Sequence, residues 1–336
     1  MKKIKVAILG ATGFTGEKLV ELLFLHPYVE IVYLFSRTQK KVSYSQIFPR
    51  FLKKVDLKCE PLDLGKAIKK CEVFFLSLPH TVSMQYVPFL LKNNKKVIDL
   101  SADYRLKNPR LYKNYYKTIH KDKKNLKKAV YGLSELFKDE IKNTQLVANP
   151  GCYATTMILA LYPLLKEGVI ENYVYVDAKS SITGAGRKPH LEYHYSNISN
   201  NLWAYKPFLH QHIPEVLEAL KTKTKIDVHI SFVPHVVGIE AGIYSTFYLK
   251  LKGKVDLDVI YKKYYENCPF IRIKKFLPHL KDVIGTNFCD LGFSLDKSKK
   301  QAVVICCIDN LIKGAAGSAI QNLNIMHGLK ETEGLL

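Results

Sequence analysis

The chain has 336 residues, of which 47% are hydrophobic, 24% charged and 11% aromatic. Domains usually contain about 100–200 residues, so this length predicts two domains, each large enough to bury a core. The composition excludes wholesale disorder, and no stretch reaches the roughly 18 uninterrupted apolar residues of a membrane span. The apolar run after the basic N-terminus is short and ends in glycines, which predicts a strand rather than a signal peptide.

The net charge of +21 raises the question of nucleic-acid binding. Only six of the 51 basic residues are arginines, and the lysines are scattered in ones and twos. The densest run, Lys121–Lys128, contains no aromatic residue, whereas base and phosphate recognition favours arginine forks and clustered patches. We therefore predict a solvated lysine-rich surface with no nucleic-acid or membrane partner, and a mild attraction for anionic substrates.

The cysteines and histidines give a second set of expectations. Seven cysteines without a C-x-x-C pair or a secretory signal predict reduced thiols in a cytoplasmic protein. Six of them are expected to be buried as small hydrophobic side chains, and Cys152 is the exception. Among the histidines, His26, His120 and His327 are expected at the solvated surface.

The first 150 residues alternate short apolar strands with helices, which indicates a parallel sheet covered on both faces. The expected strands are Lys5–Leu9, Glu30–Phe35, Val73–Leu78 and Lys96–Leu100, and the expected helices are Glu17–Leu25 and about Val82–Leu91.

After Cys152 the pattern changes to one helix followed by longer runs with β-type alternation, which predicts a mixed or antiparallel sheet. We predict an α/β protein with a Rossmann-type parallel-sheet domain and an α+β mixed-sheet domain for catalysis and dimerisation. The proposed boundaries are residues 1–150 plus 311–336 for the first domain and 151–310 for the second. The expected elements are helix Tyr153–Lys166, strands Tyr173–Lys179, Asp227–Pro234, Ile243–Leu251 and Ala302–Ile308, and a final helix Gly314–Met326 that packs back on the first domain.

A glycine-rich turn, GATGFTG, directly follows the first strand and opens the first helix. Small residues let the backbone approach a pyrophosphate, and the helix N-terminus supplies N–H donors and positive dipole. The spacing is a variant of the usual G-x-G-x-x-G, and a tight turn without a ligand is the alternative. The expected cofactor contacts are Gly10, Thr12, Gly13, Phe14, Thr15 and Gly16.

The residues after the second strand bear on the choice of cofactor. NAD-binding proteins place an acid there for the ribose 2′-hydroxyl, whereas this chain has Ser36, Arg37 and Thr38. An arginine and two hydroxyls suit a 2′-phosphate, so we predict NADP(H) rather than NAD(H). The alternative is an arginine that merely lies on the surface.

A candidate nucleophile lies at the start of the second domain, in the segment NPGCYAT. Pro150 and Gly151 make a sharp turn into a helix, so Cys152 would stand at a helix N-terminus. The dipole and N–H groups there stabilise a thiolate, which is typical of an activated nucleophile. The alternative is a small residue at a helix start.

The segment HQHIPE supplies a candidate base, since His210 and His212 in an extended stretch would point to the same side. A two-histidine metal site is the rival, but no third ligand has suitable spacing, so no metal is expected. A third segment, SSITGAGRK (180–188), carries hydroxyls, glycines and two cations and reads either as an anion-receiving loop or as a polar turn.

In order and nearly end to end, these motifs resemble the N-acetyl-gamma-glutamyl-phosphate reductases of the semialdehyde dehydrogenase superfamily. NPGCYAT and TGAGRK are specific, whereas the glycine turn is shared with the wider group. The other matching segments are DLSADYRLKNP (99–109), VYGLSEL (130–136), HQHIPE (210–215), GTNFCDLG (285–292) and DNLIKGAAGSAIQN (309–322).

The resemblance implies NADPH-dependent reductive dephosphorylation of N-acetyl-glutamyl 5-phosphate to N-acetyl-glutamate 5-semialdehyde, a step of arginine biosynthesis. It implies that Cys152 attacks the acyl phosphate to form a thioester, with His210 as general acid/base and His212 as the second candidate. It further implies a homodimer or homotetramer. Substrate contacts are expected from Arg187, Lys188, His212 and Ser181, and a contact to the nicotinamide end from Asn310.

One segment, PHVVGIEAGI (234–243), departs from the family pattern, which usually has a proline and, near Ala241, an arginine before the glycine. This chain has Gly238, Glu240 and Ala241 instead, which leaves open how the substrate anion is held. The nearest alternative function is reduction of a related acyl phosphate, either aspartyl phosphate or a carrier-linked aminoadipyl or glutamyl phosphate. A nucleic-acid-binding protein with an idle Rossmann domain and a non-catalytic NADP sensor are the alternatives from other classes.

Overall fold

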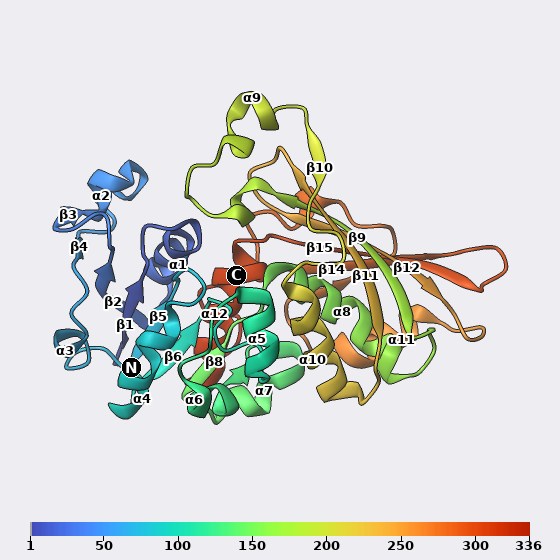
Figure 1. Ribbon diagram of the computed structural model, residues 1–336, viewed down its shortest axis with the longest axis horizontal. Coiled ribbons are helices and arrows are strands. Elements are labelled where there is room, and N and C mark those ends of the chain that lie inside the picture. The colour runs from blue at the N-terminus through green and yellow to red at the C-terminus, as the bar shows by residue number, and fades with distance from the viewer. Residues whose placement is uncertain (1) are drawn as a thin grey trace. The chain divides into compact units, whose positions relative to one another are not determined.

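The computed structural model describes residues 2–336, which form two compact units (Figure 1). One unit runs to Pro150 and includes Ala315–Leu336, and the other is Gly151–Gly314. Residues 311–314 therefore lie with the second unit rather than with the first. Within residues 2–336, no helix is both long and apolar enough to cross a bilayer.

The first unit is built on a sheet with the strand order β3-β4-β2-β1-β5-β6-β8-β7. All neighbouring strands are parallel except β3 and β4. The strand order reverses between β1 and β5, as it does in Rossmann folds. The strands are β1 Ile4–Leu9, β2 Val29–Phe35, β3 Val42–Ser43, β4 Lys58–Glu60, β5 Val73–Leu76, β6 Lys96–Asp99, β7 Val130–Tyr131 and β8 Leu146–Ala148.

The central strands of this sheet are apolar because both faces are covered. Every residue of β5 is fully buried. The helix expected near Val82–Leu91 is interrupted: a 3₁₀ turn, Ser83–Gln85, precedes α4, which has a proline in its first turn. The helices are α1 Phe14–Leu25, α2 Tyr44–Ile47, α3 Leu64–Ala67, α4 Val87–Lys92, α5 Pro109–Tyr116, α6 Lys123–Lys128, α7 Ser134–Lys142 and α12 Gly317–Met326, with a further 3₁₀ turn at Pro49–Phe51.

The second unit has a mixed sheet with the strand order β10-β11-β9-β12-β15-β14-β13, which confirms the predicted α+β architecture. The pairs β11–β9 and β13–β14 are parallel and the others antiparallel. The strands are β9 Tyr173–Ser181, β10 Leu202–Ala204, β11 His229–Val237, β12 Ile243–Lys250, β13 Ile271–Ile273, β14 Cys289–Leu295 and β15 Gln301–Ile308.

Helix α8 covers one face of this sheet, packing on β12 and β15 with α10 and α11 beside it (Figure 1). Alternation along β9 buries Val174 and Val176 and exposes Tyr173 and Tyr175, so the opposite face is more open. The helices are α8 Cys152–Lys166, α9 Tyr195–Ile198, α10 His212–Thr224 and α11 Leu257–Tyr265, with 3₁₀ turns at Ile182–Ala185, Leu191–Tyr193 and Leu280–Asp282 and a π-helical turn at Ile312–Ala316 that leads into α12.

Two histidines expected at the surface are instead buried. The His26 Nε2 atom lies 2.9 Å from Asn324 Oδ1, and the His120 Nε2 atom lies 2.7 Å from the carbonyl oxygen of Asp103. The partner of His26 is 298 residues away in sequence, so local patterning gave no sign of it. Of the six cysteines expected in the core, all are buried except Cys268, which is half-buried.

Candidate active site and cofactor site

The candidate nucleophile stands where the sequence placed it, at the first residue of a helix. Cys152 begins the 15-residue helix α8, and Gly151 is its extended N-cap. The thiol residue is half-buried, and a Cβ added to Gly314 would lie only 2.8 Å from Cys152 Cβ. Gly314, in the π-helical turn Ile312–Ala316, thus places its main chain directly against one side of the cysteine. Turns of this type are often found at functional sites.

The imidazole of His212 packs directly on the residue before the cysteine. A Cβ added to Gly151 would lie 2.3 Å from His212 Nε2 and 2.6 Å from its Cε1. Glycine is therefore needed at position 151 because the ring occupies the space of a side chain. The two histidines are not in an extended stretch as expected, since Gln211 has helical dihedral angles and α10 begins at His212.

His210 packs edge-to-face against His212 and is the more deeply buried of the two. The two rings are 4.7 Å apart between centroids, and His210 is 2% exposed. Its Nδ1 atom accepts the backbone N–H of His212 at 3.1 Å. Burial, followed by the charges of His212 and Lys206, lowers the pKa of His210 to about 2. The ring is therefore neutral, with its proton on Nε2.

A buried carboxylate holds the turn that carries the cysteine. Glu215, on the first turn of α10, is 2% exposed, and its Oε1 atom accepts the Gly151 N–H at 2.7 Å. A charge-assisted hydrogen bond of this kind is stronger than a neutral one. The same helix thus supplies both the imidazole and the anchor for the residue before Cys152.

Two tyrosines complete the surroundings of the thiol. Tyr205 donates to the Tyr153 hydroxyl at 3.3 Å, and the Tyr153 hydroxyl lies 3.3 Å from the carbonyl oxygen of His235. Burial raises the pKa of both tyrosines, and the nearby Cys152 raises it further. The sequence contained no motif around Tyr205 and gave no signal for it. We call Cys152, Tyr153, Tyr205, His210, His212 and Glu215 the thiol cluster.

The segment at residues 180–188 is an ordered turn anchored by buried polar groups. Asn310 accepts from the Ser181 hydroxyl at 3.0 Å and from the Gly242 N–H at 2.7 Å, and it donates to Thr183 Oγ1 at 3.0 Å. Thr183 in turn donates to the carbonyl oxygen of Glu240 at 2.8 Å. The buried side chains of Ser181 and Asn310 therefore hold this turn to the β11–β12 connection.

The two cations of this segment lie beyond that anchor. Arg187 and Lys188 are exposed and follow Gly186, whose φ of +85° lets the chain turn out. Thr183 contacts the β11–β12 connection at the carbonyl oxygen of Glu240, and half-buried Ala241 follows in the same connection. Among residues 2–336, no group of three or more His, Cys, Asp or Glu side chains is arranged to hold a metal ion.

In the first unit, the glycine-rich turn has the geometry that a dinucleotide requires. A Cβ at Gly10 would lie 2.1 Å from the carbonyl oxygen of Ser77, and Gly10 has a φ of +84°. A Cβ at Gly16 would meet the carbonyl oxygen of Gly10 at 2.1 Å. At Gly13, by contrast, the nearest protein atom would be 3.6 Å away, which leaves this side of the turn open. These residues fit a pyrophosphate at the N-terminus of α1.

The end of β2 lies beside this turn. The hydroxyls of Ser36 and Thr12 are 3.1 Å apart, and the Gly10 and Ala11 N–H groups donate to the carbonyl oxygen of Phe35. Ser36 is buried, whereas Arg37 and Thr38 are exposed. Residues 36–41 contain three cations and no carboxylate, so this edge suits a phosphorylated ribose better than a free 2′-hydroxyl.

Both halves of the chain match known family models. Residues 5–144 match the semialdehyde dehydrogenase NAD binding domain, and residues 152–310 match the semialdehyde dehydrogenase dimerisation domain. Solved structures share the fold: aspartate semialdehyde dehydrogenase II from Vibrio cholerae has a TM-score of 0.75 and 18% identity over 97% of this chain and 99% of that one. An NADP-bound aspartate semialdehyde dehydrogenase from Candida albicans has a TM-score of 0.71 and 15% identity over 97% and 99%.

Fold and thiol cluster thus define an oxidoreductase of the semialdehyde dehydrogenase class, with a nicotinamide dinucleotide as cofactor. Comparison with curated relatives identifies the family within this class. N-acetyl-gamma-glutamyl-phosphate reductases from Alkaliphilus metalliredigens and Campylobacter jejuni (strain 81-176) are each 44% identical, over 99% of this chain and 98% of theirs. The protein of that name from Desulforudis audaxviator is 41% identical over the same shares. The chain belongs to the N-acetyl-gamma-glutamyl-phosphate reductase family.

Proposed function

We propose that the chain reduces N-acetyl-glutamyl 5-phosphate to N-acetyl-glutamate 5-semialdehyde and phosphate, with NADPH as reductant, through a thioester on Cys152. The observation that carries this proposal is the full-length likeness to reductases of that name. The helix N-terminus at Cys152 and the imidazole packed on Gly151 supply what a thiol nucleophile needs.

The proposed reaction has two halves: the first forms a thioester on Cys152, and the second reduces it. The Cys152 sulfur attacks the acyl carbon, the carbon–oxygen bond to phosphate breaks, and the acyl group stays on sulfur. Because a thioester is more electrophilic than an oxygen ester, it suits the reduction that follows. The nicotinamide, when bound, supplies the hydride for this reduction. The hemithioacetal on Cys152 then collapses, which releases the semialdehyde and regenerates the thiolate.

We propose that His212, rather than His210, moves the proton in the first half. Its ring lies on Gly151, next to the cysteine, whereas the Nδ1 atom of His210 is already engaged by the His212 N–H. His212 would take the thiol proton and pass it to the departing phosphate. His210 would orient His212, and Glu215 would hold the Gly151 backbone in place.

For the substrate anion we propose Arg187 and Lys188, because the arginine that the family usually has near Ala241 is absent here. Lysine and arginine at a loop tip can adjust to a phosphoryl or carboxylate group. Ser181 and Asn310, which were expected to touch ligands, are engaged with each other and with the turn. Their proposed role is to hold that loop.

For the cofactor we propose NADP(H), held by Gly10, Thr12, Gly13, Phe14, Thr15 and Gly16 at the pyrophosphate and by Ser36, Arg37 and Thr38 at the 2′-phosphate. The supporting observations are the open side of the turn at Gly13 and the absence of a carboxylate in residues 36–41. The first unit would then be the cofactor domain and the second the catalytic domain.

We further propose that the chain forms a homodimer or homotetramer through the open face of the second sheet. Tyr175 and Tyr248, paired across β9 and β12, are 56% and 48% exposed, and Phe208 is 61% exposed. Large exposed aromatic side chains gathered in this way are typical of interfaces. Light scattering on the protein and on Tyr175→Glu tests this face, since the variant should have a lower mass.

The activity is tested in the reverse direction. Purified protein is given N-acetyl-glutamate 5-semialdehyde, phosphate and NADP⁺, and NADPH formation is followed by absorbance. Parallel assays replace the substrate by aspartate semialdehyde and the cofactor by NAD⁺. We expect phosphate-dependent turnover with the acetylated substrate and NADP⁺. Faster turnover of aspartate semialdehyde would assign the chain to the related acyl phosphate instead.

A further inference from the structure

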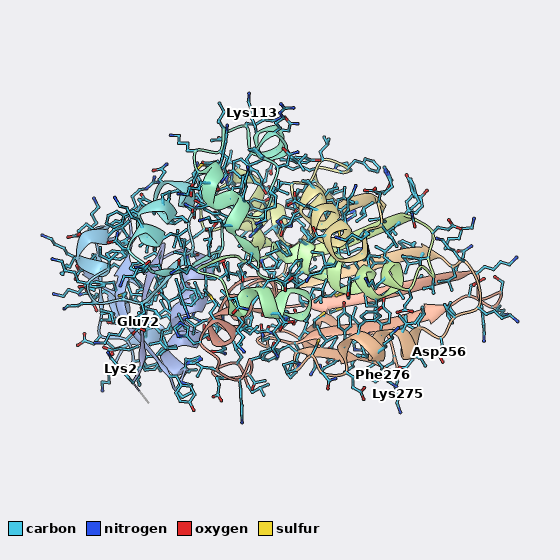
Figure 2. The ribbon with its side chains drawn as sticks, turned by 90° about the horizontal axis from the view of Figure 1, so that it is seen from below. Lys2, Glu72, Lys113, Asp256, Lys275 and Phe276 are labelled. Carbon is cyan, nitrogen blue, oxygen red and sulfur yellow. The ribbon has the colours of Figure 1, made fainter. Side chains whose placement is uncertain are left out.

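A charged pocket lies at the N-terminal ends of the strands of the first sheet, whereas the glycine-rich turn follows the C-terminal end of β1. The strands β1, β5 and β6 are neighbours and parallel, so they begin at one edge. Lysines stand at each of these three beginnings: Lys2 and Lys3 before β1, Lys69 and Lys70 shortly before β5, and Lys95 before β6. Lys2 and Glu72 mark this edge in Figure 2.

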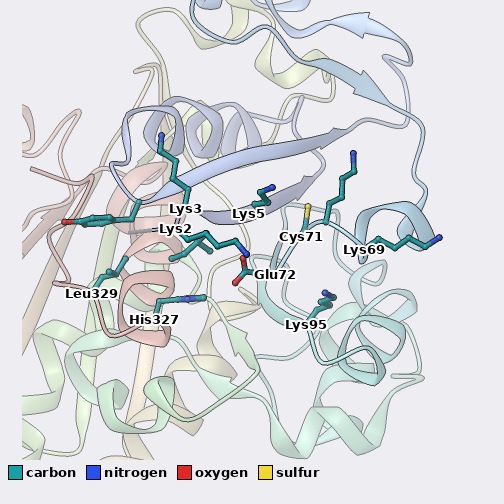
Figure 3. Close-up of a pocket in the computed structure, with 12 residues that line it drawn as sticks. Lys2, Lys3, Lys5, Lys69, Cys71, Glu72, Lys95, His327 and Leu329 are labelled. Carbon is teal, nitrogen blue, oxygen red and sulfur yellow. The ribbon is translucent and has the colours of Figure 1, made fainter.

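These lysines line a cavity in the first unit. Its volume is about 610 Å³, and the cations on its walls are Lys2, Lys3, Lys5, Lys69, Lys70 and Lys95. In Figure 3, Lys2 extends toward Glu72, with His327 and Lys95 nearby. A volume of about 300–1,000 Å³ is usual for pockets that hold a small metabolite.

The six cations of this pocket face one carboxylate on its wall, that of Glu72. None of these six lysines takes part in the ion pairs described among residues 2–336. Elsewhere surface lysines do pair, as Lys18 does with Glu21 at 2.9 Å and Lys263 with Glu167 at 2.7 Å. Glu72 is the acid of this pocket, so its wall carries a strong positive excess.

His327 contributes a polar group of a different kind. Its Nε2 atom is buried and has no hydrogen-bond partner among residues 2–336, and the residue lines the pocket. Burial and the charge of the neighbouring Lys96 lower its pKa to about 4, so the ring is neutral at pH 7. The imidazole of His327 is thus a neutral polar group on the wall of a pocket otherwise rich in cations.

We propose that this pocket binds a small metabolite that carries a chain of two or more phosphoryl groups on a hydroxyl-bearing body. The lysines would hold the phosphoryl oxygens, as lysines do in many phosphate sites, while His327 and Glu72 would hydrogen-bond the hydroxyls. The site is separate from the glycine-rich turn, because the six residues of β1 span about 20 Å between the two edges. Ligand binding at this pocket does not depend on the proposed reductase activity.

The proposal is tested by calorimetry on the full-length protein with one molar equivalent of NADP⁺ per chain, so that the dinucleotide site is filled and no excess dinucleotide competes for the second pocket. The probes are ATP, tripolyphosphate and inorganic phosphate. We expect ATP to bind more tightly than tripolyphosphate, and inorganic phosphate to bind most weakly. The double variant Lys5→Gln/Lys95→Gln replaces two half-buried lysines of the pocket. It should lower the affinity for ATP and for tripolyphosphate at least about tenfold, since each hydrogen bond to a charged group contributes appreciably.

Two further variants separate this site from general surface charge. Lys123→Gln/Lys124→Gln changes the net charge equally in the densest lysine run, and it should leave ATP affinity within about twofold of wild type because screening weakens distant charges. The exposed pair Lys2→Gln/Lys70→Gln serves if the first variant fails to fold. His327→Ala should remove the preference for ATP over tripolyphosphate. Equal losses in pocket and control variants, or no ATP binding with NADP⁺ bound, would overturn the proposal.

Discussion

Replacing Gly151 by alanine should slow turnover by displacing the His212 imidazole, with little change in the fold. The new Cβ would lie 2.3 Å from His212 Nε2, whereas ordinary contacts begin at 3.4 Å, so the ring has to move by about 1 Å. A misplacement of about 1 Å in an active site can cost about 100-fold in rate, which corresponds to about 2.7 kcal/mol in the activation barrier. The cost in stability should be about 1–3 kcal/mol, as for other overpacked positions.

The assay is kcat/KM in the reverse direction, with thermal unfolding measured on the same samples. Gly253→Ala is the matched control, because a Cβ there meets no atom of residues 2–336 within 4 Å. It should keep the wild-type rate. If Gly151→Ala is folded and retains kcat/KM within about twofold, the imidazole on Gly151 takes no part in the reaction and the reasoning fails.

Three further predictions concern the cofactor edge, the anchor of the cysteine turn and the deeper histidine. Arg37→Glu should weaken NADPH binding about 10- to 100-fold, since it removes a charge-assisted contact and adds repulsion. Glu215→Ala should cost about 1–3 kcal/mol of stability and lower kcat, because the Gly151 N–H loses its acceptor. His210 should remain a neutral Nε2–H ring by NMR down to about pH 4, below its unfolded value of about 6.5.

Each of these has its own check. NADH affinity should not fall with Arg37→Glu, and an unchanged NADPH affinity removes this arginine from the site. Glu215→Gln keeps an acceptor and should recover most of the stability. Because folded His210 resists protonation, stability should fall as the pH drops below about 6.5, and less steeply in His210→Asn. A ring that titrates near pH 6.5 in the folded protein would contradict this picture.

The two sheets and the position of the nucleophile were predictable because their signals are local. Apolar runs of strand length between helical patterns identified β1, β2 and β6 to within one residue at each end. Cys152 was placed at a helix start by the Pro-Gly turn before an apolar helical run. Such signals need no knowledge of what lies across the fold.

The contacts that give the site its geometry were not predictable in this way. The packing of His212 on Gly151, the bond from Gly151 to Glu215 and the contribution of Tyr205 join residues about 50 or more positions apart. The prediction that HQHIPE is an extended segment was wrong, because helix α10 starts at the second histidine. His26 was likewise misplaced at the surface, since its buried partner lies on α12.

The thioester itself can be measured most directly by withholding phosphate. The protein is mixed with N-acetyl-glutamate 5-semialdehyde and NADP⁺ alone, so that oxidation stops at the acyl-enzyme. The account predicts a burst of one NADPH per active site and an N-acetylglutamyl group on the peptide that contains Cys152, with neither in Cys152→Ser. Normal turnover with phosphate but no burst and no adduct on that peptide would contradict it.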